Sequence, residues 1–360
     1  MTMYLIFLLI TIIAVSLVSL VGLRRVAIAY GWVDSPCDRK NHTGQVPLIG
    51  GVSVFIALCS IYLFDTQLIH LQNSYFLISL ILVSLGFIDD KFNLSALSRL
   101  CLLFAISIWL VSAEGLVISN LGDLLGIGEI IFKGYQATIF SIFAIVGCVT
   151  CFNMIDGIDG LLGGISTIIF LSLSLLLYLS GHYGEAIFSF VFAGALVPYI
   201  ILNLTYRVSS HRKVFMGDSG SFLIGFTVVW LLIVATQPSV TPNGLGKTIN
   251  SVTALWVIAV PLMDMVLVMF KRVMKKQSPF KADRTHLHHV LLKHGYSNHQ
   301  TLFIICLFSM IVSSVGIAAD SSFMDESIMF IAFLALFVLY SFVNIKLSKG
   351  SKLVSTAPVR

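Results

Sequence analysis

The sequence is a succession of apolar runs, each roughly 16–22 residues long, that contain almost no charged side chains. An α-helix needs about 20 such residues to cross a bilayer, whereas a membrane-spanning strand needs about ten with alternating polarity. Of all residues, 58% are hydrophobic and only 11% are charged, which is too little charge for the surface of a water-soluble domain. The chain is therefore predicted to be an all-α, polytopic integral membrane protein.

Hydropathy predicts about eleven transmembrane helices in a single domain that covers residues 1–360. Arg24 and Arg25 follow the first run and no basic residue precedes it, which is the reverse of the charge order of a cleaved signal peptide. We therefore expect an uncleaved first span, an N-terminus outside and a cytoplasmic C-terminus. The predicted spans are 3–22, 47–64, 74–88, 97–113, 134–151, 160–180, 184–203, 219–236, 251–270, 300–318 and 327–345.

The distribution of basic residues supports this count. Of the 22 lysines and arginines, all except Lys133 and Lys247 fall on the inner side in this arrangement, as the positive-inside rule requires. A wrong number of spans would scramble the asymmetry. The cytoplasmic loops predicted to build an active site are 23–46, 89–96, 152–159, 204–218 and 271–299.

Two carboxylate motifs lie on the predicted inner side. GFIDDKFN contains the adjacent Asp89 and Asp90, which repel each other unless water, a divalent cation or a ligand engages them. NMIDGIDGL contains Asn153, Asp156 and Asp159, and the three-residue separation puts both carboxylates on one side of a helical turn. Taken singly, each motif also fits a solvated helix end or a polar loop.

FMGDSGS opens the eighth predicted span and contains Phe215 and Asp218. An acid among small residues at a helix N-terminus is either a cap or a Mg²⁺ ligand beside amides that can face phosphate oxygens. Lys213 lies just upstream. It could contact phosphate, although the positive-inside rule alone also accounts for it.

A histidine-rich motif, DRTHLHHVLLKH, lies in the 271–299 loop and contains Arg284, His286, His288 and His289. Histidines bind metals, transfer protons or donate to phosphate. Zinc is disfavoured because no cysteine or glutamate lies nearby, and a structural histidine cluster stays open. Asp264, in PLMDM, lies inside a predicted span, where structural and functional interpretations are equally good.

Together, these acids and bases describe a Mg²⁺-dependent phosphoryl-transfer site, in which Mn²⁺ could substitute. Carboxylate oxygens hold the cation, and basic groups neutralise phosphate oxygens. The sequence contains neither a P-loop nor GxGxxG, so it is not a standard nucleotide-hydrolysing site. A natural pairing at the membrane surface is a water-soluble nucleotide donor with a phosphate anchored in the lipid bilayer.

The motifs DDKFN, NMIDGIDGL, KVFMGDSGS, ALWVIAVPLMDM and SPFKADRTHLHH resemble, in this order, those of the polyprenyl-phosphate N-acetylhexosamine-1-phosphate transferase superfamily. The bacterial undecaprenyl-phosphate N-acetylglucosamine-1-phosphate transferases are the most similar branch. The resemblance implies transfer of N-acetylglucosamine 1-phosphate from UDP-GlcNAc to undecaprenyl phosphate, with release of UMP, at the cytoplasmic face of a bacterial inner membrane. It also implies the first lipid-linked step of a surface polysaccharide pathway, such as lipopolysaccharide O-antigen synthesis.

The resemblance also implies roles for individual residues. Asp218 would be the best Mg²⁺ ligand. Asp89 would be a base towards the lipid phosphate, although an ionised phosphate barely needs one. Asp90, beside Asp89, would be a catalytic residue and a second metal ligand. The motif reads DDKFN rather than DDxxK, so no lysine role is carried over. The other catalytic candidates are Asp156, Asp159 and His286, and the substrate-binding candidates are Asn153, Asn203, Lys213, Phe215, Arg284, His288 and His289.

Two alternatives remain at this stage. One is the same chemistry with another UDP-N-acetylhexosamine. The other is a secondary transporter. A transporter is expected to have acidic residues near the middle of the membrane and inverted repeats, whereas the acidic residues here cluster on one side. No nucleic-acid partner is expected. The residues leave open a homodimer, one or two metal ions, and direct displacement or a covalent intermediate.

Overall fold

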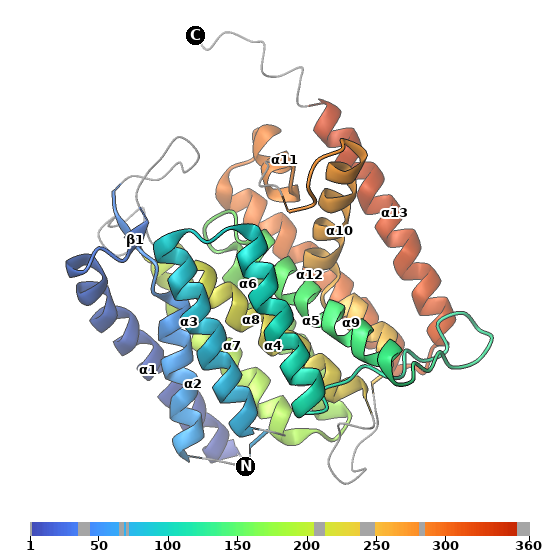
Figure 1. The fold of residues 1–360 in the computed structure, drawn as a ribbon, viewed down its shortest axis with the longest axis horizontal. Coiled ribbons are helices and arrows are strands. Elements are labelled where there is room, and N and C mark those ends of the chain that lie inside the picture. The colour runs from blue at the N-terminus through green and yellow to red at the C-terminus, as the bar shows by residue number, and fades with distance from the viewer. Residues whose placement is uncertain are drawn as a thin grey trace.

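The computed structural model describes residues 2–34, 44–64, 68–69, 72–204, 213–237, 249–280 and 285–350. These residues form a helical bundle with one short antiparallel hairpin (Figure 1), so the predicted all-α class is confirmed. In chain order the elements are α1 (Thr2–Ala29), β1 (Val33–Asp34), β2 (Val46–Pro47), α2 (Gly50–Phe64), α3 (Gln72–Phe92), α4 (Ala96–Ala113), α5 (Tyr135–Ile155), α6 (Leu161–Leu179), α7 (Tyr183–Leu204), α8 (Gly217–Thr236), α9 (Ser251–Val257), α10 (Ala259–Met274), α11 (Leu287–Lys293), α12 (Asn298–Ser321) and α13 (Glu326–Gly350).

The chain is a polytopic membrane protein. Of the described helices, eight are long and apolar enough to cross a membrane, namely α1, α4, α5, α6, α7, α8, α12 and α13. The pair α9 and α10 meets the same criteria but bends by 81°. Each predicted span overlaps a helix or this pair, yet α2 is shorter than a full span. Length and composition therefore support eight or nine spans and do not establish eleven.

The bend between α9 and α10 has a local cause. Pro261 has no N–H to donate to the carbonyl of Val257, and the helix breaks between these residues, at Ile258. The break turns α10 away from the direction of α9. It also places Asp264 near the start of the second segment.

Helix α8 is the centre of the bundle, since every one of its residues except Asp218 is buried. It packs against α2, α3 and α5. A Cβ atom built on Gly86 of α3 would lie 2.2 Å from the backbone nitrogen of Ser219, so glycine is needed for this close approach. The contact brings Asp89 and Asp90, one turn further along α3, to the N-terminus of α8.

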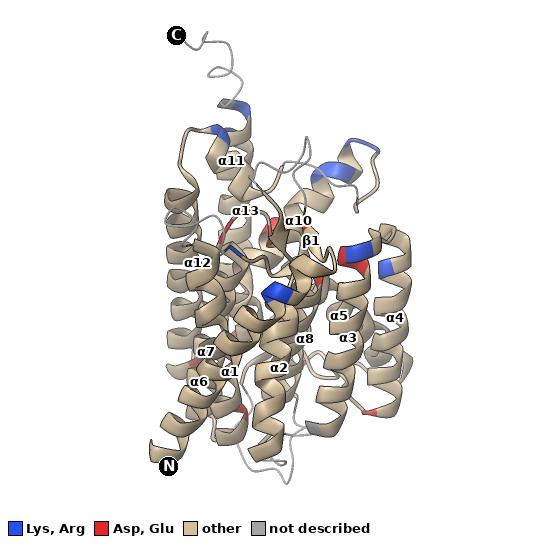
Figure 2. Ribbon diagram, turned by 90° about the vertical axis from the view of Figure 1, so that its left-hand side faces the viewer, with Lys and Arg blue, Asp and Glu red and all other residues tan. Residues whose placement is uncertain are grey.

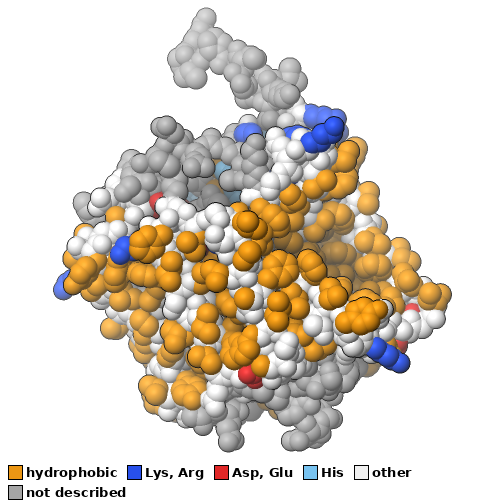
Figure 3. Space-filling model, in the orientation of Figure 1, with side chains coloured by type: hydrophobic (Ala, Val, Ile, Leu, Met, Phe, Trp, Pro, Cys, Tyr) orange, Lys and Arg blue, Asp and Glu red, His pale blue; other side chains and the backbone are white. Residues whose placement is uncertain are grey.

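The two ends of the bundle differ in charge. Lysine and arginine gather at the end away from the N-terminus, and the last helix, α13, ends there (Figure 2). The face seen in Figure 3 is largely covered by apolar side chains. Exposed apolar residues of the bundle include Leu102, Phe143 and Leu339. This is the surface expected of a protein whose sides face lipid. The site described below lies at the basic end.

Candidate active site

A cavity of about 990 Å³ is lined by residues of the basic end of the bundle, among them Lys91 and Lys213. Its volume is at the upper limit of the usual range for small-molecule sites, roughly 300–1,000 Å³. Residues from four separate motifs of the sequence meet in its wall. The predicted residues that line it are Asp89, Asp90, Asn153, Asp156, Asp159, Asn203, Lys213, Phe215, Asp218 and His289.

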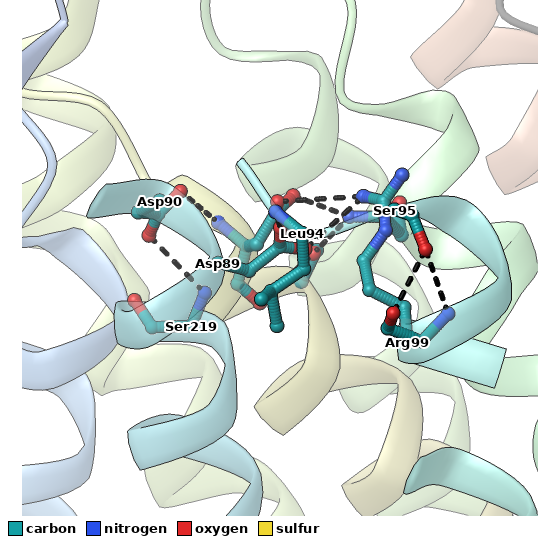
Figure 4. Close-up of polar contacts among 10 residues, drawn as sticks. Asp89, Asp90, Leu94, Ser95, Arg99 and Ser219 are labelled. Carbon is teal, nitrogen blue, oxygen red and sulfur yellow. Dashed lines mark hydrogen bonds and ion pairs between the residues drawn. The ribbon is translucent and has the colours of Figure 1, made fainter. Parts of the chain in front are cut away.

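Asp90 faces the first turn of α8. Its Oδ1 accepts a hydrogen bond of 2.9 Å from the backbone N–H of Asp218, and the N–H of Ser219 lies 3.5 Å from Oδ2 (Figure 4). Gly217 begins the helix with a φ of +73°, a value that glycine adopts without strain. Asp90 therefore satisfies the helix N-terminus that carries Asp218.

Asp218 is held from two sides. Asn153 donates from Nδ2 to Oδ1 at 2.6 Å, and Arg99 lies 3.6 Å from Oδ2. The same guanidinium lies 3.2 Å from Oδ2 of Asp89. The other carboxylate oxygen of Asp89, Oδ1, accepts a hydrogen bond of 2.8 Å from the N–H of Leu94 (Figure 4). Arg99 thus lies between two carboxylates from different helices and offsets part of their charge.

The pKa values of Asp89 and Asp90 are raised because these carboxyl groups are buried close to other acids. Asp89 and Asp90 lie beyond the predicted span 74–88. Burial and the charge of Asp218 raise the pKa of Asp89 to about 6, against the opposing effects of Arg99 and the Leu94 amide. Burial and Asp218 likewise raise the pKa of Asp90 to about 8, against the two amides of α8. The three carboxyl groups repel one another, and a divalent cation would relieve that repulsion.

The donor set fits a hard cation such as Mg²⁺, because it consists of carboxylate oxygens around one wall of the cavity. Within the part of the chain that the structure describes, no group of three or more histidine, cysteine, aspartate or glutamate side chains is arranged to hold a metal ion by itself. Mg²⁺ usually keeps several waters and takes further ligands from substrate phosphates. Such an ion needs only one or two of these carboxylates.

Another part of the cavity wall comes from the residues that directly precede α8 and α6. Lys213 Nζ lies 2.7 Å from Asp159 Oδ2 and 4.9 Å from the centre of the Phe215 ring. Phe215 itself is held by the hairpin, since its N–H donates to the carbonyl of Pro47 at 2.9 Å. Asp156 is exposed at the cavity surface. This wall combines an aromatic face with a cation and two carboxylates.

Both polar atoms of the Asn203 side-chain amide form hydrogen bonds with the protein backbone. Its Oδ1 accepts from the N–H of Gly160 at 2.6 Å, and its Nδ2 donates to the carbonyl of Val214 at 2.7 Å. The side chain is only 1% exposed. Asn203 therefore ties the NMIDGIDGL turn to the segment before α8, and its predicted part in nucleotide binding remains a prediction.

The histidines lie between two cavities. His286 and His288 line a second, smaller cavity of about 250 Å³, and His289 lines both. His288 is 2% exposed, and its Nε2 has no hydrogen-bond partner among the described residues. Burial, and then the neighbouring His289, lower the pKa of His288 to about 3, so the ring is neutral. Arg284 lies outside the described residues.

Sequence reasoning missed Arg99 and Arg272. Arg99 stands in the first turn of α4, after the Ser95 cap, and Arg272 lines the smaller cavity from α10. Both had been explained by the positive-inside rule, which accounts for any basic residue near an inner span end. The one available signal was that Arg99 follows the Asp89–Asp90 pair by a single short turn.

A bundle of apolar helices with a carboxylate-rich cavity at its basic end is the arrangement expected of a membrane-embedded transferase of phosphate-containing groups. Comparison with known proteins agrees. Residues 73–236 match the model of glycosyl transferase family 4.

Several curated relatives carry the name undecaprenyl-phosphate alpha-N-acetylglucosaminyl 1-phosphate transferase. That of Yersinia pestis is 40% identical over 89% of this chain and 86% of its own. That of Haemophilus influenzae is 38% identical over 89% of each chain. That of Escherichia coli K12 is 39% identical over 89% of this chain and 85% of its own. The chain therefore belongs to glycosyl transferase family 4, in the branch formed by these bacterial sugar 1-phosphate transferases.

Proposed function

We propose that the protein transfers N-acetylglucosamine 1-phosphate from UDP-GlcNAc to undecaprenyl phosphate. An oxygen of the lipid phosphate attacks the β-phosphorus of the donor, and the bond from that phosphorus to the bridging oxygen breaks. UMP leaves with the bridging oxygen, and undecaprenyl-pyrophosphoryl-GlcNAc remains. The observation that carries the proposal is the meeting of four motifs in one cavity, in a chain whose relatives are named for this reaction.

The larger cavity suits the nucleotide sugar. Phe215 offers an aromatic ring for contact with uracil, and Lys213 Nζ lies 4.9 Å from the centre of that ring. Asp159 keeps the lysine in place through their 2.7 Å ion pair. Gly217 and Asp218, at the start of α8, line the same cavity.

The smaller cavity suits the acceptor. Leu100, Leu103 and Phe222 form apolar parts of its wall, while Arg99 and Arg272 supply positive charge. This pairing of surfaces fits a phosphate head on a prenyl chain. The two cavities share Asn153, Gly157 and His289, so donor and acceptor phosphates would approach each other beside Asp218.

Asp218 and Asp90 would hold Mg²⁺, or Mn²⁺ in its place, and the ion would neutralise charge on the diphosphate. Asp89 would orient the acceptor phosphate through its pair with Arg99. Asp156, Asn153, His288 and His289 would contact the sugar diphosphate.

The proposed orientation has eleven spans in one domain, with the N-terminus outside and the C-terminus in the cytoplasm of a bacterial cell. The gathering of lysine and arginine at the cavity end supports it (Figure 2), because basic residues are retained on the cytoplasmic side. The active site would then face the cytoplasm at the inner membrane, where nucleotide sugars are present. The product would begin a surface polysaccharide such as O-antigen.

The test uses the full chain, purified in detergent, with undecaprenyl phosphate, UDP-GlcNAc and Mg²⁺. We expect UMP and a lipid-extractable sugar in equal amounts, and none of either after EDTA. UDP-GalNAc and a 6-deoxy UDP-sugar, offered in parallel, test the choice of hexosamine. If a relative is active in the same assay while this chain consumes none of the donors, the proposed reaction is wrong and transport must be tested in proteoliposomes.

A further inference from the structure

A buried carboxylate in α10 organises the histidine segment from within the bundle. Asp264 is 2% exposed. Its Oδ2 lies 2.6 Å from His286 Nδ1, and its Oδ1 accepts from the N–H of Leu287 at 2.9 Å and from the hydroxyl of Tyr340 at 2.9 Å. Tyr340 belongs to the last helix, α13. One carboxylate therefore joins three segments of the chain.

The partners of His286 define its tautomer. Arg272 Nη2 lies 3.4 Å from His286 Nε2, and a guanidinium N–H can only donate. Nε2 must therefore accept, and the ring proton lies on Nδ1, where it is donated to Asp264. With both ring nitrogens engaged and 6% of the residue exposed, His286 is poorly placed to exchange a proton with a substrate.

His286 is also where α11 begins, since it is the N-cap residue of that helix. Helix α11 has seven residues, which is too short to be stable by itself, so its position depends on tertiary contacts. His288 follows within the first turn. Its ring is parallel to that of His286 at 5.7 Å and lies 4.2 Å from that of His289. The three rings therefore lie in a row, and all three line the smaller cavity.

We propose that Asp264, with Tyr340 and Arg272, is a positioning device that holds His286 as the anchor of α11 and so places His288 and His289 at the junction of the two cavities. Asp264 acts through His286 and touches no substrate. The proposal rests on the proposed function, because turnover is one of its readouts. A positioning role and a direct catalytic role for His286 predict different activities for the variants of His286.

The decisive comparison is between two replacements of His286. The amide nitrogen of asparagine sits where Nδ1 of histidine does, so His286→Asn keeps a donor to Asp264 and removes acid–base capacity. We expect its kcat to stay within about 10-fold of the wild type, and His286→Leu to lose about 100-fold or more. Equal, large losses in both folded variants would overturn the proposal and make His286 a direct participant.

A double-mutant cycle tests whether Asp264 works through His286. In Asp264→Asn the amide nitrogen would face Nδ1, forcing the ring proton to Nε2 and against Arg272. We expect about a 100-fold loss of kcat. Asp264→Asn with His286→Leu should be no slower than His286→Leu alone, because interacting residues are not additive. If the double variant instead loses the product of the two single losses of kcat, Asp264 and His286 act independently and the network is refuted.

Matched tyrosine variants separate positioning from stability. Tyr340→Phe removes one donor to Asp264, and Tyr75→Phe removes the buried hydroxyl that contacts Thr227 at 2.7 Å. Both should lower the thermal midpoint similarly, but only Tyr340→Phe should lower kcat. If kcat follows stability equally in both, Tyr340 has only a structural role.

A chemical readout distinguishes failure of this proposal from failure of the proposed reaction. Diethyl pyrocarbonate modifies accessible imidazoles, and peptide mapping reports each site. In the wild type His286 should be protected while the exposed His299 is modified, and Asp264→Asn should expose His286 to modification at least several-fold faster. Unchanged protection in a folded Asp264→Asn protein would refute the network even if the protein turned over no donor.

Discussion

Replacing Gly86 by alanine tests how the site depends on helix packing. The added Cβ would lie 2.2 Å from the backbone nitrogen of Ser219, about 1.2 Å short of the 3.4 Å at which ordinary van der Waals contact begins. The obstacle is backbone rather than a flexible side chain, so α3 and α8 must separate. Overpacking of this kind costs about 1–3 kcal/mol, or more where the backbone cannot move.

The functional consequence should exceed the loss of stability. A shift of about 1 Å between α3 and α8 would break the 2.9 Å contact of Asp90 with the amide of Asp218. Misplacement of this size can cost about 100-fold in rate. We therefore expect Gly86→Ala to fold with a lowered thermal midpoint and to lose about 100-fold in kcat.

The matched control is Gly147→Ala in α5, where the added Cβ would have no heavy atom within 4 Å. Alanine favours a helix over glycine by about 1 kcal/mol, so this variant should be as stable as the wild type or more so, with full activity. Thermal unfolding in detergent and UMP release measure both quantities. Full activity and an unchanged midpoint in Gly86→Ala would refute the packing argument.

Three further predictions concern the cavity. Asp218→Asn should remain folded by size-exclusion chromatography, yet lose turnover and respond less to added Mg²⁺; full activity would remove Asp218 from the site. Arg99→Gln leaves Asp89 and Asp218 without their shared cation, so its thermal midpoint should fall in EDTA and recover in Mg²⁺ more than that of the wild type; equal responses would contradict this role. Lys213→Met should raise KM for the UDP-sugar about 10-fold, since a charge-assisted hydrogen bond contributes about 1.5–3 kcal/mol; an unchanged KM would place the nucleotide elsewhere.

The helices were largely predictable because a bilayer leaves the backbone few choices. Each apolar run must satisfy its own hydrogen bonds, so hydropathy alone locates the helices. The count was less certain, because it depends on elements such as α2, which is shorter than a full span. The break at Ile258 also divides one apolar run into α9 and α10.

The candidate site was predictable as a set of motifs. Carboxylates, glycines and histidines at the inner ends of successive spans share one side of the membrane whatever the packing, and all described candidates line the two cavities. Their individual tasks were not predictable. Asn203 and His286 have the residue types of ligand-binding groups, yet their polar atoms bond to other parts of the chain.

The sequence by itself determined that this chain lies in a membrane, where its helices run, and which polar residues share the basic side, because these depend on local hydropathy and charge. Only the tertiary structure decided which of those residues meet. Arg99 pairs with Asp218 across the bundle, and Tyr340 reaches Asp264 from 76 positions away in the chain. Such contacts depend on how the helices pack, and packing is a property of facing surfaces that no single segment of sequence contains.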